Sequence, residues 1–542
     1  MAEKQRRWPA AATGWIFRIV MALVLGIVLL CQGWDYAYKT DVVWKNWLCL
    51  IVGAAGAAAL YMAARTVTAY EHRRAVRLAW IGGLSLVTAG LAFYLAAHYA
   101  FTPGWDAGFM CESASALAAE DVDPVAYAYL SEFPNNTLLT WGMSRMFLLS
   151  DAMGLPHSQR YFLILGVQSA GFGLTAYLLY LCADKLAGKE HPAVPLWTWM
   201  TGLILVCASP WVSVQYSDVP ALILAMIETA LYLNARDGRH PALWTGLLGA
   251  AGLAAYHIKP QGAFPLIAFA VITVCENFPG MFRKERLRRT GAVALGFLIG
   301  AGLVQGGVTA VKNSFGDHLN PDDAVGPAHY LMMGMNPEAM GVFSYDDLEF
   351  SEGFTNPRER TAGDLERLRV RIQEMGAEGV LKQRVRKTMT NFADGTFTWE
   401  QEEVFFAYDT YYFPAGNDWV YENVLPFYIS EKNDLMVEWS CSWIFRLIEQ
   451  CAWMAVMALC LFSAGGKKDS RVAALQLTLL GLILFETLFE ARARYVFCCL
   501  PVFILVSGVG IGRAEEGIRR ATDAWRARRP VRTVHVLAEE RK

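Results

Sequence analysis

The stretch "WIFRIVMALVLGIVLLCQG", residues 15–33, decides the fold class of this chain. It is almost entirely apolar, and a helix of this length reaches roughly 28 Å, close to the thickness of a bilayer core. A secretory signal peptide is a poor alternative, because no small-x-small cleavage pattern follows. Cys31 also lacks the small residue that precedes a lipidated cysteine. We therefore interpret this stretch as a membrane helix.

Similar apolar stretches recur along the 542 residues, of which 55% are hydrophobic and only 18% are charged. This composition is typical of proteins embedded in a bilayer. We predict an all-α polytopic membrane protein with about twelve transmembrane helices. After the first, the predicted spans are 47–64, 78–97, 161–182, 196–211, 220–234, 243–256, 263–275, 291–311, 443–462, 472–489 and 495–511.

The distribution of Lys and Arg predicts how these helices are oriented. Basic residues gather at 4–7, 65–77, 283–289, 467–471 and in the tail 514–542. If twelve helices alternate, all these loops lie on one side. The positive-inside rule assigns that side to the cytoplasm, so both termini are predicted to be cytoplasmic in a multi-pass protein of the cell membrane.

Two long segments, 99–160 and 313–440, interrupt the spans and are predicted to be extracytoplasmic. The first segment follows residues 1–98, which form a cytoplasmic tail and three helices. The central helices of 161–312 lie between the two segments. The C-terminal helices of 441–513 and the basic tail 514–542 follow the second segment. In the second segment, the spacing of Leu365, Leu368, Ile372 and Met375 predicts an amphipathic helix, on the membrane surface or against the bundle. The Asp-Gly pair in "ADGTF" predicts a turn back toward the membrane.

Ionisable residues gather at the outer ends of several predicted spans. Such residues are rare in membrane segments, because desolvating a charge costs at least a few kcal/mol, and they often mark function. These residues come from separate loops, but all are predicted to lie at the same membrane face. They are Asp106, Asp218, His257, Lys259, Glu490, Arg492 and Arg494.

Most of these residues also have a purely structural interpretation. Asp218 precedes Pro220 and has the position of a helix N-cap. Lys259 has the side chain to reach toward the interface. Glu490 and Arg494 have the spacing of a helical ion pair. For His257 we favour a structural hydrogen bond.

Asp106 lies in "GWDAG", where Gly104 and Gly108 permit close backbone approach and Trp105 can shape a pocket. Helix capping is its structural alternative. A carboxylate near cations at an outer membrane surface indicates group transfer from a lipid phosphate. Arg and Lys bind phosphate oxygens, while the carboxylate takes the proton of an attacking hydroxyl.

Metal, disulfide and nucleic-acid functions receive little support. Most of the eleven cysteines lie in apolar spans, and pairing of Cys111 with Cys441 stays open. No C-x-x-C motif is present, so we predict no metal site and no cofactor. A net charge of −2 gives no reason to expect nucleic acid as a partner.

The layout resembles the GT-C superfamily of integral-membrane glycosyltransferases, in particular the bacterial branch of protein O-mannosyltransferases and lipid A aminoarabinose transferases. The motifs that carry the resemblance form an ordered series over most of the chain. They are "PGWDAG" with Asp106, "EFPNNTLLTWG" with Asn135 and Asn136, "YSDVPA" with Asp218, "IKPQG" with Lys259, "HYLMMGMN" with His329 and Asn336, "ADGTF" with Asp394 and "EARARY" with Glu490, Arg494 and Tyr495.

The resemblance implies an inverting transfer of a hexose or pentose from a polyprenyl-phosphate donor to a cell-envelope polysaccharide, lipid or protein, on the outer face of the membrane. Asp106 is the expected general base. Lys259 with Arg492 or Arg494 is expected to hold the donor phosphate. The residues expected to contact the sugar or the acceptor are Glu112, Asn135, Asn136, Asp218, His257, His329, Glu490 and Tyr495.

The chain departs from that superfamily in two places. Many relatives carry paired acids in the first loop, whereas Ala107 follows Asp106 here, which weakens a metal-assisted mechanism. The helical hairpin of residues 15–64 also precedes the usual first helix, and its role is not predicted.

Two other classes of protein compete with a transferase. A polysaccharide or lipid-sugar flippase would also have about twelve spans and phosphate-binding cations, but it would place ionisable residues near the middle of the membrane. An envelope-assembly scaffold would carry out no chemistry. The polar set at one face favours the enzyme.

Overall fold

The computed structural model consists of helices and loops throughout the part of the chain that it describes, which confirms the all-α prediction. The described residues are 2–40, 44–71, 73–98, 104–121, 124–156, 159–277, 284–403, 418–430, 439–464 and 469–527. Pro103, the basic residues Arg283, Lys467 and Lys468, and the tail beyond residue 527 contributed to the predictions above and lie outside this range.

Eight helices within the described residues are long and apolar enough to cross a membrane. The shortest, with 19 residues, spans roughly 28 Å at 1.5 Å per residue. They coincide with eight of the predicted spans. They are α1 (Ala2–Leu30), α2 (Asn46–Tyr70), α3 (Arg74–His98), α7 (Phe162–Ala183), α9 (Asp218–Asp237), α12 (Lys284–Ser314), α19 (Ser442–Phe462) and α20 (Ser470–Leu488).

The other four predicted spans are also helical, but they are shorter or more polar. They correspond to α8 (Val194–Gly202) with the π-helical turn η3 (Leu203–Cys207), α10 (Pro241–Ile258), α11 (Ala263–Asn277), and α21 (Arg494–Phe497) with α22 (Leu500–Ala527). In α22 the residues from Leu500 to Gly512 are buried, and charges begin at Arg513. The structure thus supports eight spans, and membrane crossing by these four stays a prediction.

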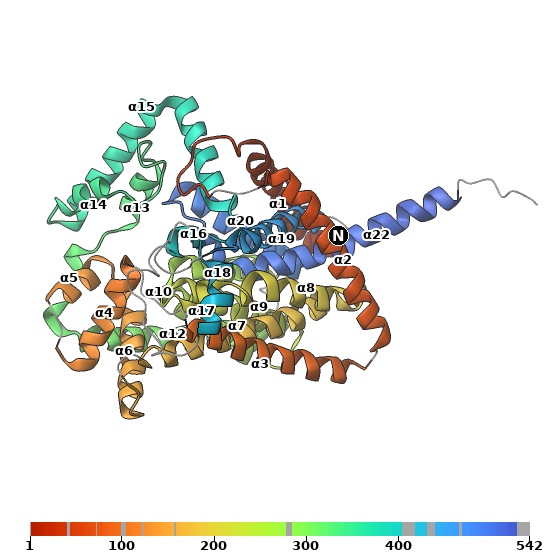
Figure 1. Ribbon diagram of the computed structural model, residues 1–542, viewed down its shortest axis with the longest axis horizontal. Coiled ribbons are helices and arrows are strands. Elements are labelled where there is room, and N and C mark those ends of the chain that lie inside the picture. Colours follow the sequence, from red (N-terminus) through yellow and green to blue (C-terminus); the bar gives the residue numbers. More distant parts are fainter. Residues whose placement is uncertain are drawn as a thin grey trace, which may run out of the picture.

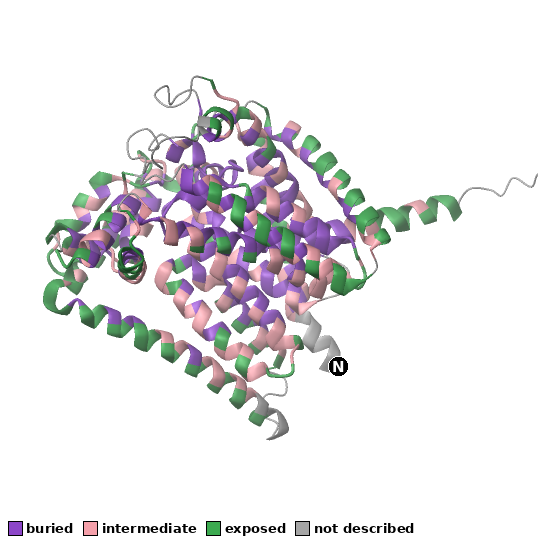
Figure 2. Cartoon of the chain, turned by 60° about the horizontal axis from the view of Figure 1, so that its bottom comes forward, coloured by how far each residue is buried: buried purple, intermediate pink, exposed green. Residues whose placement is uncertain are grey.

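The helices form one bundle whose buried residues concentrate at its centre, while the outlying helices expose many side chains (Figure 2). Exposed apolar residues on the outlying α1 and α12 include Leu23 and Leu303. Small residues allow the closest helix contacts: a Cβ atom at Gly300 of α12 would overlap the carbonyl oxygen of Gly246 in α10. The apolar outer surface and the small-residue contacts are those of a membrane bundle.

Further helices form the two inserted segments, and most of them lie toward one side of the bundle (Figure 1). The first segment folds into α4 (Asp106–Ala119), α5 (Pro124–Glu132) and α6 (Thr137–Ala152). The second contains α13 (Pro327–Gly334), α14 (Tyr345–Glu352), α15 (Pro357–Phe392), α16 (Trp399–Glu402), α17 (Asp418–Asn423) and α18 (Leu425–Tyr428).

The amphipathic helix predicted in the second segment is α15, but its apolar stripe does not form the packed face. Leu365 and Ile372 are exposed, whereas Arg360 and Asp364 are buried. The helix kinks at Gly376, whose φ of 60° and ψ of −175° are not helical. The predicted Asp-Gly turn follows α15, and Gly395 lies against the backbone of Glu449 in α19.

Candidate functional site

Five segments that are distant in the sequence bring polar and aromatic side chains together. They are the start of α4, the segment before α9, the link between α10 and α11, helix α16, and the link from α20 to α21. We call this group the Asp106 cluster. It comprises Trp105, Asp106, Tyr216, Asp218, Lys259, Glu402, Glu490, Arg492, Arg494 and Tyr495.

Asp106 is the first residue of α4, and the N-cap position belongs to Trp105, which makes no side-chain capping bond. An acidic residue in the first turn is favourable because it faces the positive end of the helix dipole. The carboxylate itself accepts a hydrogen bond from the Tyr216 hydroxyl, with 3.1 Å between Oδ2 and the phenolic oxygen. The capping interpretation is therefore wrong for this side chain, which points into the cluster and is half-buried.

Lys259 and Asp218 form a buried ion pair, with 2.5 Å between Nζ and Oδ1. Both residues are at most 5% exposed, so Lys259 does not reach out to the membrane surface. The N-cap of α9 is Ser217 rather than Asp218. The ammonium group also lies 4.7 Å from the Tyr495 ring centre and 5.7 Å from that of Tyr216. Both structural alternatives for this pair are thus wrong.

Arg492 is neutralised by Glu402, with 2.6 Å between Nη2 and Oε1. The other oxygen of Glu402 accepts a 2.7 Å hydrogen bond from the indole nitrogen of Trp105. Glu402 is fully buried. Glu402 therefore connects Arg492, in the link after α20, to Trp105, the neighbour of Asp106. These contacts hold the Trp105 ring in place.

Arg494 differs from the other two cations because it is buried and forms no ion pair with a carboxylate of the described residues. Its guanidinium carbon lies 3.9 Å from the Trp105 ring centre and 5.2 Å from that of Tyr216. Its Nε and Nη1 atoms have no hydrogen-bond partner within the described residues. Cation–π contacts partly stabilise the buried charge. The N–H groups on Nε and Nη1 of Arg494 can therefore donate hydrogen bonds to a bound anion.

Glu490 and Arg494 do not form the predicted helical ion pair. Helix α20 ends at Leu488 and α21 begins at Arg494, so Glu490 lies in the link between the helices. Glu490 is buried and bonded to the side chain of Tyr495. Burial raises the pKa of Glu490, and the neighbouring Arg494 and Arg492 oppose that rise. The predicted ion pair needs a helical backbone between Glu490 and Arg494, and the link between α20 and α21 is not helical.

Further hydrogen bonds support Asp106 from α5 and from the link between α5 and α6. The Asn136 amide donates to the Tyr129 hydroxyl at 2.6 Å, and the Asn135 amide donates to Asn136 at 3.0 Å. Burial, followed by the charge of Asp106, raises the pKa of Tyr129, which also bonds to Asp106. The two predicted asparagines thus lie behind the carboxylate as positioning residues.

Two predicted contact residues point elsewhere. Glu112 is exposed on α4, and its position six residues after Asp106 places it roughly 240° around the helix. His257 bonds to Gln305 of α12, with 3.1 Å between Nε2 and Oε1. The structural hydrogen bond favoured for His257 is confirmed, and neither residue belongs to the Asp106 cluster.

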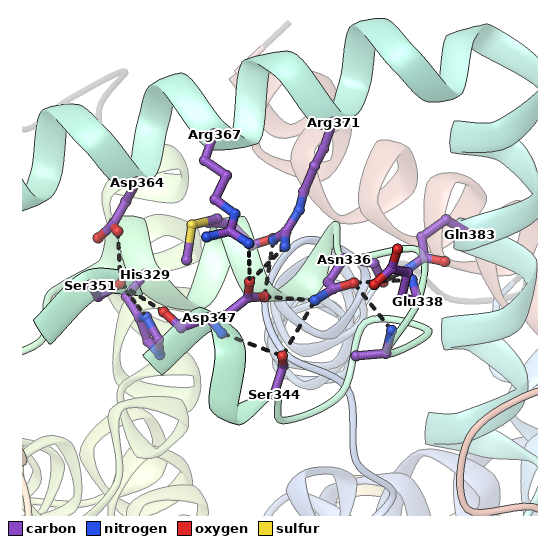
Figure 3. A network of polar contacts seen from close by, with 12 residues as sticks. His329, Asn336, Glu338, Ser344, Asp347, Ser351, Asp364, Arg367, Arg371 and Gln383 are labelled. Carbon is purple, nitrogen blue, oxygen red and sulfur yellow. Dashed lines mark hydrogen bonds and ion pairs between the residues drawn. The ribbon is translucent and has the colours of Figure 1, made fainter. Parts of the chain in front are cut away.

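His329 belongs to a separate network that joins α13, α14 and α15 (Figure 3). Its Nδ1 lies 2.8 Å from the Ser351 hydroxyl, which donates to Asp364 at 2.8 Å. In the same network, Arg371 donates to both oxygens of Asp347 at 3.0 and 2.6 Å. Burial lowers the pKa of His329 to about 4. This geometry assigns His329 to holding the subdomain together.

Two residues of the Asp106 cluster and two buried glutamates were not predicted from the sequence. Tyr216 stands two residues before Asp218, and Glu402 follows the "ADGTF" turn. Glu228 in α9 and Glu486 in α20 are fully buried, and both oxygens of each carboxyl lack partners among the described residues. A single carboxylate inside an apolar span is a recognisable signal in the sequence for Glu228 and Glu486.

Metal and disulfide geometry are both absent from the described part of the chain. No group of three or more His, Cys, Asp or Glu residues there is arranged to hold a metal ion. No disulfide joins the described cysteines, so the open pairing of Cys111 in α4 with Cys441 before α19 is not formed. The Asp106 cluster consists of carboxylates, cations and aromatic rings alone.

Comparison with known proteins places the chain among membrane proteins. A family model described as "Conserved hypothetical integral membrane protein" matches residues 11–514. No curated protein and no solved structure matches it. Because the matched residues cover nearly the whole chain, and the helices have the length and hydropathy of membrane spans, the protein belongs to this family of integral membrane proteins.

Proposed function

We propose that the protein is an extracytoplasmic glycosyltransferase that moves a sugar from a polyprenyl-phosphate donor to a hydroxyl group of a cell-envelope acceptor. The observation that supports this most is that one partly exposed carboxylate and one buried guanidinium, two of whose donors lack partners among the described residues, both contact the side chain of Tyr216. Asp106 is bonded to Tyr216, and Arg494 lies over both Tyr216 and Trp105.

In the proposed reaction, the acceptor oxygen attacks the anomeric carbon of the donor. The bond from that carbon to the phosphate oxygen breaks, and the configuration is inverted. The hydroxyl proton passes to the Asp106 carboxylate, and polyprenyl phosphate leaves with the bonding electron pair. Arg494 stabilises the charge that grows on the departing phosphate through its unpartnered donors.

The ion pairs divide the three predicted phosphate-binding cations into two roles. Asp218 and Glu402 already neutralise Lys259 and Arg492. A phosphate would have to compete with carboxylates at 2.5 and 2.6 Å for those two residues. We therefore assign direct phosphate binding to Arg494, and we assign positioning of the aromatic rings to the two pairs.

Transfer assays with the purified protein and a panel of polyprenyl-phosphate sugars test this proposal. Asp106→Asn is expected to lower kcat by about 10²- to 10⁴-fold, which is the usual contribution of a general base. Arg494→Lys keeps the charge but loses the planar fork, and we expect it to lower kcat/KM by about 10²-fold. Asp121→Asn, an exposed change in the loop after α4, is the matched control.

Undiminished turnover by Asp106→Asn would remove the assigned base. Turnover by Arg494→Lys equal to that of the unmodified protein would remove the assigned phosphate site. No turnover with any donor would favour the second candidate, a transporter of lipid-linked sugars.

A transporter is the second candidate function because the helices contain buried carboxylates. Glu228 lies in the middle of α9 with both oxygens unpartnered among the described residues, as expected of a proton- or ion-coupled carrier. Proteoliposomes with a fluorescent lipid-linked sugar distinguish the two functions. Translocation that is lost in Glu228→Gln and kept in Asp106→Asn would establish the carrier.

A further inference from the structure

A second polar region lies at the opposite ends of the helices that carry the Asp106 cluster. Helix α9 begins at Asp218 in the cluster and ends at Asp237, which pairs with Arg471 at 3.3 Å near the start of α20. Helix α20 ends just before Glu490. Twenty residues of helix span about 30 Å, so the two regions are about one bilayer core apart.

A cavity of about 550 Å³ opens at this far end, between the end of α7, the start of α20 and the middle of α22. Six Lys or Arg residues line it, against three Asp or Glu residues. The cations come from separate helices: Lys185 and Lys189 follow α7, Arg471 lies in α20, and Arg513, Arg519 and Arg520 lie in α22. The cavity is therefore electropositive.

Internal pairing satisfies only part of this positive charge. Arg471 pairs with Asp469 at 2.7 Å, and Arg520 pairs with Glu516. Lys185 donates to the neutral amide of Asn234 at 2.7 Å, which leaves its charge uncompensated by that contact. Lys189 and Arg519 are exposed at the mouth. The walls thus hold more cations than their own carboxylates neutralise.

The backbone is also unusual at this wall. Residues Asp184–Gly188 form a π-helical turn, η2, that continues α7 and carries Lys185, Leu186 and Ala187 of the lining. Such turns are rare and occur often at functional sites, because the wider turn redirects side chains. The turn is an independent indication that this wall is shaped for a ligand.

A neighbouring cavity of about 420 Å³ shares Glu190, His191, Glu516 and Arg519 with the first. Its own carboxylate, Glu515, is fully engaged: Tyr61 donates to it at 2.6 Å, and Arg65 contacts it at 3.3 Å. His191 lies 3.5 Å from the same carboxylate. Three Lys or Arg residues line this second cavity against three Asp or Glu residues, so the excess of positive charge lies in the first cavity.

We propose that the first cavity binds an anionic phosphate group, supplied by the headgroup of an anionic lipid or by free inorganic phosphate. Basic pockets between transmembrane helices, at the membrane surface with the most Lys and Arg, hold lipid headgroups in this way. Arg forks and Lys ammonium groups are the side chains that bind phosphate oxygens. This site is distinct from the Asp106 cluster and does not depend on the proposed transfer reaction.

The test measures thermal stabilisation of the full chain in neutral detergent by three probes: short-chain phosphatidic acid, inorganic phosphate, and short-chain phosphatidylcholine. A ligand that binds only the folded state raises the unfolding temperature in a saturable way. Lys189→Gln with Arg519→Gln removes two exposed cations without disturbing the core. We expect affinity for phosphatidic acid to fall about fivefold per cation, or about 25-fold in the pair.

The control removes two exposed cations elsewhere, Arg369→Gln with Lys382→Gln on α15, and should leave the affinity unchanged. Saturable binding of phosphatidic acid alone identifies a lipid headgroup, and saturable binding of inorganic phosphate as well identifies the phosphate group itself. The proposal is overturned if neither phosphate probe binds saturably, if phosphatidylcholine binds equally well, or if the cavity and control variants weaken binding equally.

Discussion

At the scale of single residues, pairing rather than residue type decides what each cation of the Asp106 cluster can do. Lys259, Arg492 and Arg494 look equivalent in the sequence, since all three stand at the outer ends of predicted spans. In the structure two of them are bound to buried carboxylates, whereas Arg494 pairs with no carboxylate in the described part of the chain. Only an unpaired cation can give its full charge to a ligand.

The Lys259–Asp218 pair makes a prediction about stability. Lys259→Met leaves Asp218 buried and unpaired, and its Oδ2 already lacks a partner among the described residues. We expect a loss of about 3–5 kcal/mol in unfolding free energy. The double change Lys259→Met with Asp218→Leu should recover most of this loss, because no isolated charge remains.

Thermal unfolding in detergent measures the stability of the single variant and of the double variant. Glu112→Gln, at an exposed carboxylate, controls for the loss of a surface charge. If Lys259→Met unfolds at the same temperature as the unmodified protein, the pair does not stabilise the fold.

At the scale of helices, α15 shows how a pattern can predict an element and still misjudge its environment. The apolar spacing correctly predicted a helix, but Leu365 is 45% exposed. The packed face carries charges, because Arg371 reaches Asp347 of α14 (Figure 3). Arg360 on the same helix donates to backbone carbonyl groups. Buried charges are tolerated there because hydrogen bonds satisfy them.

The kink in α15 leads to a second prediction. Gly376 has a φ of 60° and a ψ of −175°, a combination that side chains other than glycine rarely adopt. Gly376→Ala should destabilise the protein by about 1–3 kcal/mol, although no atom lies near the added Cβ. Thermal unfolding is the measurement.

Gly517→Ala is the matched control for this change. Gly517 lies in helical backbone of α22 with open space around it, and we expect a gain of up to about 1 kcal/mol. An equal effect of the two substitutions would show that α15 is not held in its kinked form.

At the scale of the whole molecule, α9 and α20 connect two chemically different ends. One end carries the Asp106 cluster and the other carries the electropositive cavity. In Figure 1 the subdomain of α13 to α15 and the charged part of α22 lie on opposite sides of the bundle. The excess of Lys and Arg at the second end predicts that it faces the cytoplasm. The proposed transferase then acts at the extracytoplasmic surface.

Cysteine labelling tests this orientation. Arg369→Cys and Ile518→Cys place exposed thiols at the two ends, in a background where the exposed native Cys275 is serine. A membrane-impermeant maleimide should label Arg369→Cys on intact cells, and Ile518→Cys only after permeabilisation. The reverse pattern would place the Asp106 cluster in the cytoplasm and rule out the proposed extracytoplasmic reaction.

The sequence by itself determined the helical membrane class, the positions of eight spans and the two inserted segments. Hydropathy and helical periodicity are properties of neighbouring residues, so they can be read along the chain. It also placed Asp106, Asp218, Lys259 and Arg494 near one face, because each follows or precedes an apolar span.

Only the tertiary structure decided which of these side chains meet. His257 stands two residues before Lys259, yet it bonds to α12 while Lys259 turns to Asp218. Glu402 enters the cluster from a segment more than a hundred residues from its partner Trp105. Side-chain direction depends on how each helix is rotated and where it ends, and long-range packing fixes both, which is why local patterns did not reveal these contacts.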